Sequence, residues 1–274
     1  MPSNPNSVAV VTSFSLAGWH KYGSRFVATF NEFWPKEVDL HLVSEDEFHV
    51  EQDGGRNIKV WNLYDSNVAS PFLIKYQDEA WAHGNSKTQL PPGVRGWANR
   101  NGYCFRHDAY KFSKKVFAIE LVARKIRAKK LFWIDADVVT FAPVPETFFS
   151  LALPAEYALS YLGRTDYHSE CGFIGYDLRN AVALRFIRGF AKLYSSGEVF
   201  KLEEWHDSWV FDWLRKETAI PAFSIPHGSN HHPFINSMLG KYMDHLKGNR
   251  KVRGKSHWAE QHKHSSEPYW SGRR

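Results

Sequence analysis

Two acidic residues separated by one position follow a run of apolar residues. Asp135 and Asp137 come directly after the segment Leu-Phe-Trp-Ile at 131–134. Such a run indicates a buried strand, and residues i and i+2 of an extended chain share a face, so both carboxylates can converge. Two carboxylates with open positions beside them suit Mg²⁺ or Mn²⁺, which keep water or substrate phosphates as further ligands. A solvent-facing turn is the alternative; the buried strand before the pair and the segment VVTFAPVP after it favour a metal site.

Two further acidic residues lie where regular elements are expected to begin. Glu170 precedes a Gly-containing apolar segment, Cys-Gly-Phe-Ile-Gly at 171–175. Asp207 lies within Trp-His-Asp-Ser-Trp at 205–209, near the start of an expected helix. An acid at a helix N-terminus is favourable in its own right, so Asp207 is either a catalytic carboxylate or a helix-terminal residue.

A histidine near the C-terminus is a third candidate metal ligand. His245 opens the pattern H-x-x-G-x-x-K, which continues with Gly248 and ends at Lys251. An imidazole can complete a two-carboxylate site for Mn²⁺, and glycine allows the backbone to approach a phosphate closely. Three other histidines compete for the same role: His227, His231 and His232.

The elements that must position these residues alternate between strand and helix. Apolar runs and alternation predict strands at 8–14, 38–43, 58–63, 131–134, 158–162 and 171–178. Helical spacing and caps predict helices at 24–34, 106–128, 180–195 and 203–217, with a long loop and short helices at 64–105. This order predicts an α/β fold with a mostly parallel sheet flanked by helices.

From Val8 to about Lys251, this order and the segment Trp-Ile-Asp-Ala-Asp at 133–137 resemble the GT-A glycosyltransferases. The resemblance implies a hexosyltransferase-like enzyme in which Asp137 binds a divalent cation, Mn²⁺ or Mg²⁺, and Asp135 contacts the metal or the ribose. The cation faces the diphosphate of a nucleotide-sugar, with a UDP-sugar favoured. The nucleotide would be contacted by the end of the first strand and by the helix before the metal motif: Thr12, Ser13, Phe14, Arg106 and Lys114. The same helix carries Lys111 and Lys115, and basic residues of this helix commonly face the nucleotide in these enzymes.

The C-terminal pattern is similar to that of retaining enzymes of the glycogenin and bacterial galactosyltransferase type. It implies that His245 is the third metal ligand and that Gly248 and Lys251 meet the diphosphate, although the family usually continues with Pro-Trp after the lysine and this chain does not. Glu170 and Asp207 would then stabilise the sugar cation, or deprotonate the acceptor if the enzyme inverts. The resemblance favours retention.

The net charge of +6 lies entirely in the C-terminal segment. Residues 241–274 contain nine Lys or Arg and three acids, which leaves 26 of each sign in residues 1–240. A localised basic end indicates an anionic partner. We therefore expect a catalytic domain over 1–240 and a basic segment over 241–274. Residues 245–251 would fold over the donor as a clamp, and residues 260–274, with few apolar anchors, would be mobile.

Composition and motif content narrow the class of protein. The sequence has 274 residues, two cysteines and no apolar run of the roughly 18 residues needed to span a membrane. We expect a cytoplasmic enzyme without a signal peptide, with peripheral contact to a membrane left open.

A sugar-phosphate nucleotidyltransferase would need a Gly-rich basic loop, whereas residues 12–18 contain one Gly and no Lys or Arg. A nucleic-acid binder would leave the acidic pair unexplained, so no nucleic acid is expected. Whether the acceptor is a glycan, a lipid or a protein, and the oligomeric state, stay open.

Overall fold

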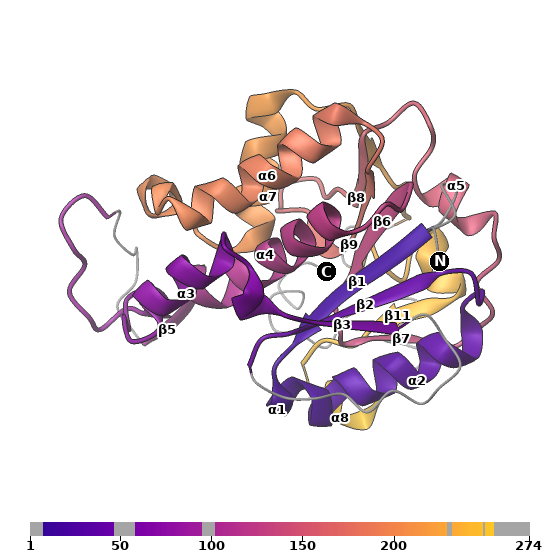
Figure 1. Cartoon of the computed structure of the whole chain (residues 1–274), viewed down its shortest axis with the longest axis horizontal. Helices are drawn as coiled ribbons and strands as arrows, with labels where there is room; N and C mark the ends of the chain where they lie inside the picture. Colours follow the sequence, from indigo (N-terminus) through magenta and orange to yellow (C-terminus); the bar gives the residue numbers. More distant parts are fainter. Residues whose placement is uncertain (1–7, 47–57, 95–101, 229–231, 249, 255–274) are drawn as a thin grey trace.

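The computed structural model describes residues 8–46, 58–94, 102–228, 232–248 and 250–254, without the side chains of 252 and 253. In these residues a central sheet of seven strands has the order β10-β8-β9-β6-β1-β2-β3 (Figure 1). Only β9 runs antiparallel to its neighbours; the other six strands share one direction. The predicted α/β class with a mostly parallel sheet is therefore confirmed. The strands are β1 (Val8–Phe14), β2 (Asp39–Ser44), β3 (Ile58–Asn62), β6 (Lys130–Ile134), β8 (Leu159–Leu162), β9 (Glu170–Asp177) and β10 (Ala222–Ser224).

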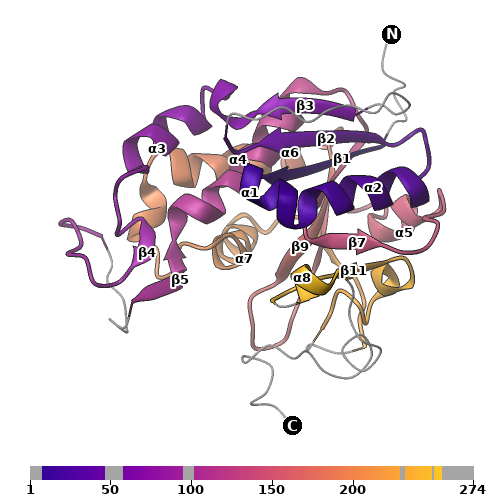
Figure 2. The same ribbon diagram turned by 90° about the horizontal axis from the view of Figure 1, so that it is seen from below.

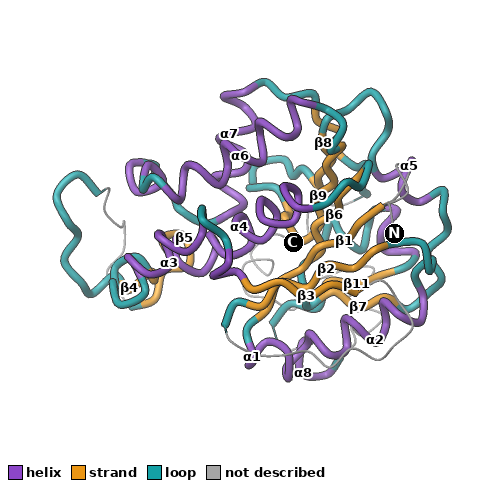
Figure 3. Tube along the Cα trace, viewed as in Figure 1, coloured by secondary structure: helices purple, strands orange, loops and turns teal. Residues whose placement is uncertain are grey.

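Both faces of the sheet are covered, which explains why its central strands read as continuous apolar runs. In β6, Leu131 and Trp133 pack on one face, whereas Phe132 and Ile134 pack on the other. Figure 3 shows helices on either side of the strands. The first face is covered by α3 (Ala69–Tyr76), α4 (Ala109–Lys125), α6 (Ala181–Ser195) and α7 (Asp207–Thr218); the second is covered by α2 (Ser24–Phe33) and α5 (Phe148–Ala152).

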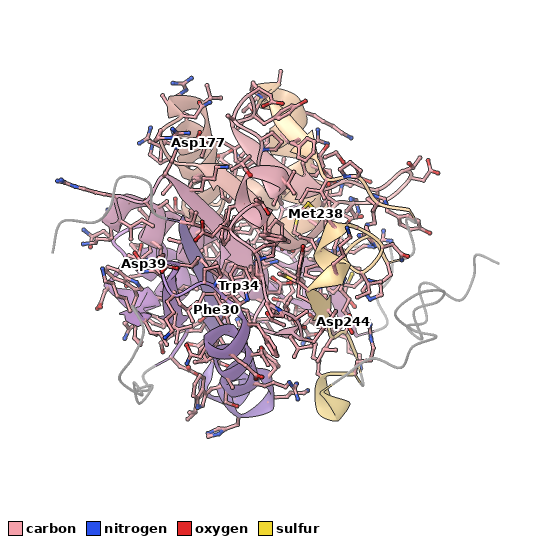
Figure 4. All side chains as sticks on the ribbon, turned by 90° about the vertical axis from the view of Figure 1, so that its right-hand side faces the viewer. Phe30, Trp34, Asp39, Asp177, Met238 and Asp244 are labelled. Carbon is pink, nitrogen blue, oxygen red and sulfur yellow. The ribbon has the colours of Figure 1, made fainter. Side chains whose placement is uncertain are left out.

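A two-stranded ribbon below the second face joins the acidic motif to the C-terminal segment. Strand β7 (Val138–Thr140) follows the motif directly, and β11 (Met243–His245) pairs with it antiparallel (Figure 2). Trp34 stacks on Phe30, with ring centroids 4.8 Å apart; both residues are labelled in Figure 4. The Trp34 indole N–H donates to Thr140 Oγ1 at 2.9 Å. Helix α2 therefore braces the ribbon from outside.

The described part of the basic segment follows this ribbon back to the N-terminal region. It continues from β11 into α8 (Arg250–Arg253), and the Arg25 guanidinium donates to the Lys251 carbonyl at 2.7 Å. Residues 255–274, which include the segment 260–274 predicted to be mobile, lie outside the described residues.

Two predicted helices begin later than expected. The helix predicted from Arg106 begins at Ala109, because the Asp108 side chain accepts a hydrogen bond from the Lys111 amide and caps it. The residues before it form β5 (Tyr103–Asp108), paired with β4 (His83–Asn85) where a loop was predicted. The helix predicted from Glu203 begins at Asp207. Among the described residues, no helix is both long and apolar enough to span a bilayer.

We predict that two glycine-to-alanine substitutions change stability in opposite directions. At Gly175, a Cβ atom would lie 2.6 Å from Ser160 Oγ and 2.7 Å from the Phe132 ring, so Gly175→Ala should lower the free energy of unfolding by about 1–3 kcal/mol. At Gly189 in α6, the nearest atom would be a Leu214 methyl at 3.9 Å, so Gly189→Ala should raise it by about 0.5–1 kcal/mol. Urea denaturation measures both, and equal effects would contradict the packing described.

Candidate active site

The two motif carboxylates converge on one histidine. The chain turns at the end of β6, where the Val138 amide donates to the Asp135 carbonyl at 3.0 Å. His245 lies opposite Val138 in the ribbon, and its Nε2 is 3.0 Å from Asp137 Oδ1 and 3.5 Å from Asp135 Oδ2. One ligand atom from each of these three side chains lies within 4.8 Å of the other two. The ribbon therefore brings together the three residues predicted to bind metal.

The imidazole of His245 fits against a glycine and a second carboxylate. His245 is 3% exposed, and a Cβ atom at Gly172 would lie 2.5 Å from its Nδ1. The same Nδ1 is 3.3 Å from Glu170 Oε1, at the start of β9. Burial lowers the pKa of His245, but Asp137 and Glu170 raise it more, with a net rise to about 9. In the metal-free protein this imidazole is therefore protonated at neutral pH.

Three lysines are interleaved with the carboxylates. Lys115 of α4 lies 2.7 Å from Asp135 Oδ1 and 2.7 Å from Asp207 Oδ2. Lys251 lies 2.6 Å from Asp137 Oδ2, and Lys247 contacts Glu170 Oε2. Each buried acid thus has a cation against it, as charges removed from water require. Glu170 and Asp207 were predicted to share a pocket with the motif. His245 lies between Glu170 and Asp137, and Lys115 lies between Asp207 and Asp135.

The pKa directions describe a site in which opposite charges hold one another ionised. Burial raises the pKa of the Asp137 carboxyl, but His245 and Lys251 outweigh it and hold the pKa well below its usual range. The pKa of Glu170 is also depressed, against burial, by Lys247 and His245. Burial lowers the pKa of Lys115, yet Asp135 and Asp207 leave it well above normal. Asp137 and Glu170 are therefore ionised at neutral pH and can bind a cation without first losing a proton.

Three residues at the end of β1 were predicted to meet the nucleoside. The Ser13 hydroxyl donates to Glu45 Oε1 at 2.7 Å. Thr12 is fully buried, and its hydroxyl has no hydrogen-bond partner among the described residues. Phe14 is 1% exposed, with its ring 5.3 Å from that of Trp19. The Phe14 side chain therefore packs in the core, whereas the Ser13 side chain contacts the carboxylate of Glu45.

Of the remaining residues predicted to contact the donor, Lys114 and Gly248 lie near the site and Arg106 does not. Lys114 Nζ lies 3.4 Å from Glu45 Oε2, on the Ser13 side of the site. Gly248 has φ +57, in the left-handed region that glycine adopts readily, and lies between Lys247 and Lys251. The structure does not bring Arg106 to the motif; its half-exposed side chain pairs with Glu204 at 3.1 Å.

The competing histidines have other partners. His232 Nε2 lies 2.9 Å from Arg250 Nη1, and the His227 ring contacts the Gly163 carbonyl. His231 lies outside the described residues. The ligand set that includes the motif carboxylates thus contains His245 and neither His227 nor His232.

The sequence analysis named Lys115 only as one of several basic residues that could face the nucleotide, and it gave Lys247 no role in the site. Lys115 lies in the middle of α4 beside other bases, and nothing in its spacing separates it from a solvated lysine. The available signal was indirect: two neighbouring carboxylates, the partly exposed Asp135 and the buried Asp207, need a cation between them. Asp207 is the first residue of α7, and the N-cap of this helix is His206. The Asp207 carboxylate is not the cap; it pairs with Lys115 in the site.

Comparisons with known proteins give remote similarities. No protein-family model and no curated protein sequence matches the chain. The fold is similar to two structures of the glycosyltransferase GlyE of Streptococcus pneumoniae TIGR4, one of them the apo form. Their TM-scores are 0.45 and 0.44, with 11% and 10% sequence identity over 80% of this chain. The matched region covers 45% of each of those longer chains, and no residue role is carried over from them.

We predict that the stability of the metal-free protein falls as the pH rises from 6.5 to 9. The pKa of His245 is raised from 6.5 to about 9 in the folded state, so its contribution is complete below pH 6.5 and lost as the pH passes 9. The loss should be on the order of 3 kcal/mol. Urea unfolding at several pH values measures it.

A matched pair of variants isolates this contribution. His245→Asn should flatten the pH dependence between 6.5 and 9, whereas His20→Asn, at an exposed position, should leave it unchanged. The buried histidines whose pKa values are lowered, such as His41 and His232, titrate below this window. An imidazole signal of His245 that is already neutral at pH 7 by NMR would contradict the assignment.

Proposed function

We propose that this protein is a metal-dependent glycosyltransferase, which moves a sugar from a nucleotide-diphosphate donor, preferably a UDP-sugar, to a hydroxyl acceptor. The observation that carries the proposal is the convergence of Asp135, Asp137 and His245, with Lys247 and Lys251 on the same segment as the histidine. Carboxylates for a cation and lysines for phosphate are the two groups that a nucleotide diphosphate requires.

The residues present fit a divalent cation such as Mn²⁺ or Mg²⁺. Asp135 and Asp137 offer hard oxygen atoms, His245 offers a nitrogen that Mn²⁺ accepts, and Gly172 leaves room for the imidazole. When bound, the cation supplies positive charge that stabilises the departing diphosphate. In the metal-free protein His245 carries a proton that it must release, because an imidazole ligand is neutral.

The lysines stabilise the leaving group. Lys251 pairs with Asp137 in the metal-free protein, and a cation on Asp137 would replace that pairing and free the ammonium for phosphate. Lys247 and the left-handed turn at Gly248 lie on the same short segment. As the bond between the anomeric carbon and the phosphate oxygen breaks, the electron pair passes to the diphosphate, where these charges are already placed.

The carboxylates Glu170 and Asp207 face the sugar. Both are buried, and each pairs with a lysine: Glu170 with Lys247 and Asp207 with Lys115. An anion beside the anomeric carbon stabilises oxocarbenium character there. The acceptor oxygen then bonds to that carbon and its proton leaves, to the diphosphate if configuration is retained or to a carboxylate if it inverts. The H-x-x-G-x-x-K pattern favours retention.

We predict that Asp137→Asn abolishes donor turnover without unfolding the protein. A screen of nucleotide-sugars with Mn²⁺, read as donor hydrolysis or transfer, should show activity for the wild type. The variant should lose roughly 100-fold or more, because it removes a cation-binding charge at a strand end. Asp78→Asn, at an exposed loop position, is the matched control. Full activity of Asp137→Asn, or of the wild type in excess EDTA, would exclude the metal-dependent mechanism.

We also predict that Lys251 binds the phosphates and not the nucleoside. Lys251→Met should weaken UDP binding in Mn²⁺ by about 10- to 100-fold, the range of a hydrogen bond to a charged group. Uridine, which lacks phosphates, should bind both proteins equally, and Lys241→Met at an exposed position should behave like the wild type. Calorimetric titration measures all of these, and an equal loss for uridine and UDP would place Lys251 elsewhere.

A further inference from the structure

A second group of metal-ligating side chains lies outside the donor site. It comprises His168 from the loop between β8 and β9, and Glu204 and His206 from the loop before α7. Glu204 Oε2 is 2.8 Å from His206 Nε2 and 3.4 Å from His168 Nε2. One ligand atom of each residue lies within 4.8 Å of the other two. Two loops far apart in the sequence thus direct two imidazole nitrogens at one carboxylate oxygen.

The environment of Glu204 leaves that oxygen to the imidazoles. Arg106 Nη1 takes the other oxygen, Oε1, at 3.1 Å. Glu204 and His206 are 7% and 4% exposed. The carboxylate is therefore buried, with one oxygen on Arg106 and the other facing the two imidazole nitrogens.

The imidazole of His206 is held by packing. The rings of Phe105 and Phe112 lie with centroids 5.5 Å and 5.8 Å from it, and the His168 ring lies 5.0 Å away. A ligand fixed by its surroundings loses little freedom when a metal binds. The side chain of His168 is 36% exposed, which gives an ion access from solvent.

We infer that His168, Glu204 and His206 form a second metal site, specific for a zinc-class cation. Two imidazoles and one carboxylate are a ligand set that suits Zn²⁺, with a fourth position for water. The donor site has the opposite balance, two carboxylates and one imidazole, which suits Mn²⁺ or Mg²⁺. The two sites would then bind different metals, because their ligand sets differ.

The position of this site gives it a structural consequence. His168 lies two residues before Glu170, and His206 immediately precedes Asp207. A zinc ion shared by the two loops would fix the starts of β9 and α7 relative to each other, and with them both carboxylates. That this zinc ion positions catalytic carboxylates rests on the proposed function; the metal site itself does not.

Zinc stoichiometry of the full chain tests the inference. The protein is stripped of metal, loaded with Zn²⁺ in excess Mg²⁺, dialysed, and its bound zinc counted by elemental analysis. His168→Ala should hold one zinc ion fewer per chain than the wild type. Its zinc affinity should fall by more than the roughly 10- to 100-fold that is typical when a residue hydrogen-bonded to a metal ligand is lost. His168→Cys should retain the ion, because a thiolate is a zinc ligand. Glu203→Gln, an exposed neighbour, should retain it too.

A structural role for His168 alone predicts a different pattern. Because His168 is partly exposed, the alanine variant should fold, and its unfolding temperature without metal should match that of the wild type. Added Zn²⁺ should then raise this temperature in the wild type more than in His168→Ala. Equal zinc in the wild type and His168→Ala, or no recovery in His168→Cys, would overturn the inference. Neither readout needs transferase activity, so failure of the proposed function would leave this test intact.

Discussion

The insertion of His245 between three carboxylates is the interaction on which the rest of the site depends. Its two ring nitrogens lie 3.0 Å from Asp137 and 3.3 Å from Glu170. This position exists only because β11 pairs with β7 and because residue 172 has no side chain. A buried imidazole among acids takes a proton, which balances the site while no metal is bound. His245 Nε2, which faces the two motif carboxylates, becomes available to a metal once that proton leaves.

The single reversed strand explains how Glu170 reaches this histidine. The motif acids follow the carboxyl end of β6. A strand parallel to β6 would also end at this point, whereas an antiparallel strand begins there. Because β9 runs antiparallel to β6, with Ile134 opposite Phe173, its first residue lies beside the motif. The Asp135 amide then donates to the Gly172 carbonyl at 3.0 Å, which joins the two strand ends directly. Helix α4 contributes Lys115 from the other side, so elements from the whole chain meet at one edge of the sheet.

The strands and the acidic motif could be predicted from local pattern, because a strand buried on both faces must be apolar throughout. The strand predicted at 8–14 is present with the same bounds, and the helix predicted at 24–34 ends at Phe33, one residue earlier than expected. The direction of β9 and the pairing of β11 with β7 depend on tertiary contacts that no local pattern encodes. The role of Lys247 and the pairing of Lys115 with Asp135 and Asp207 could not be predicted for the same reason. The helix that begins at Asp207 was predicted too early because Glu203–His206 contains polar residues whose partners, Arg106, His107 and His168, lie far away in the sequence.

In the proposed mechanism a divalent cation and a nucleotide diphosphate share one site. If they do, binding of either must strengthen binding of the other by the same factor, because the coupling free energy is reciprocal. Calorimetric titration of Mn²⁺ with and without UDP, and of UDP with and without Mn²⁺, measures that factor. We predict mutual strengthening of at least about tenfold, equivalent to about 1.4 kcal/mol, and none when uridine replaces UDP. Independent binding of Mn²⁺ and UDP would contradict the account.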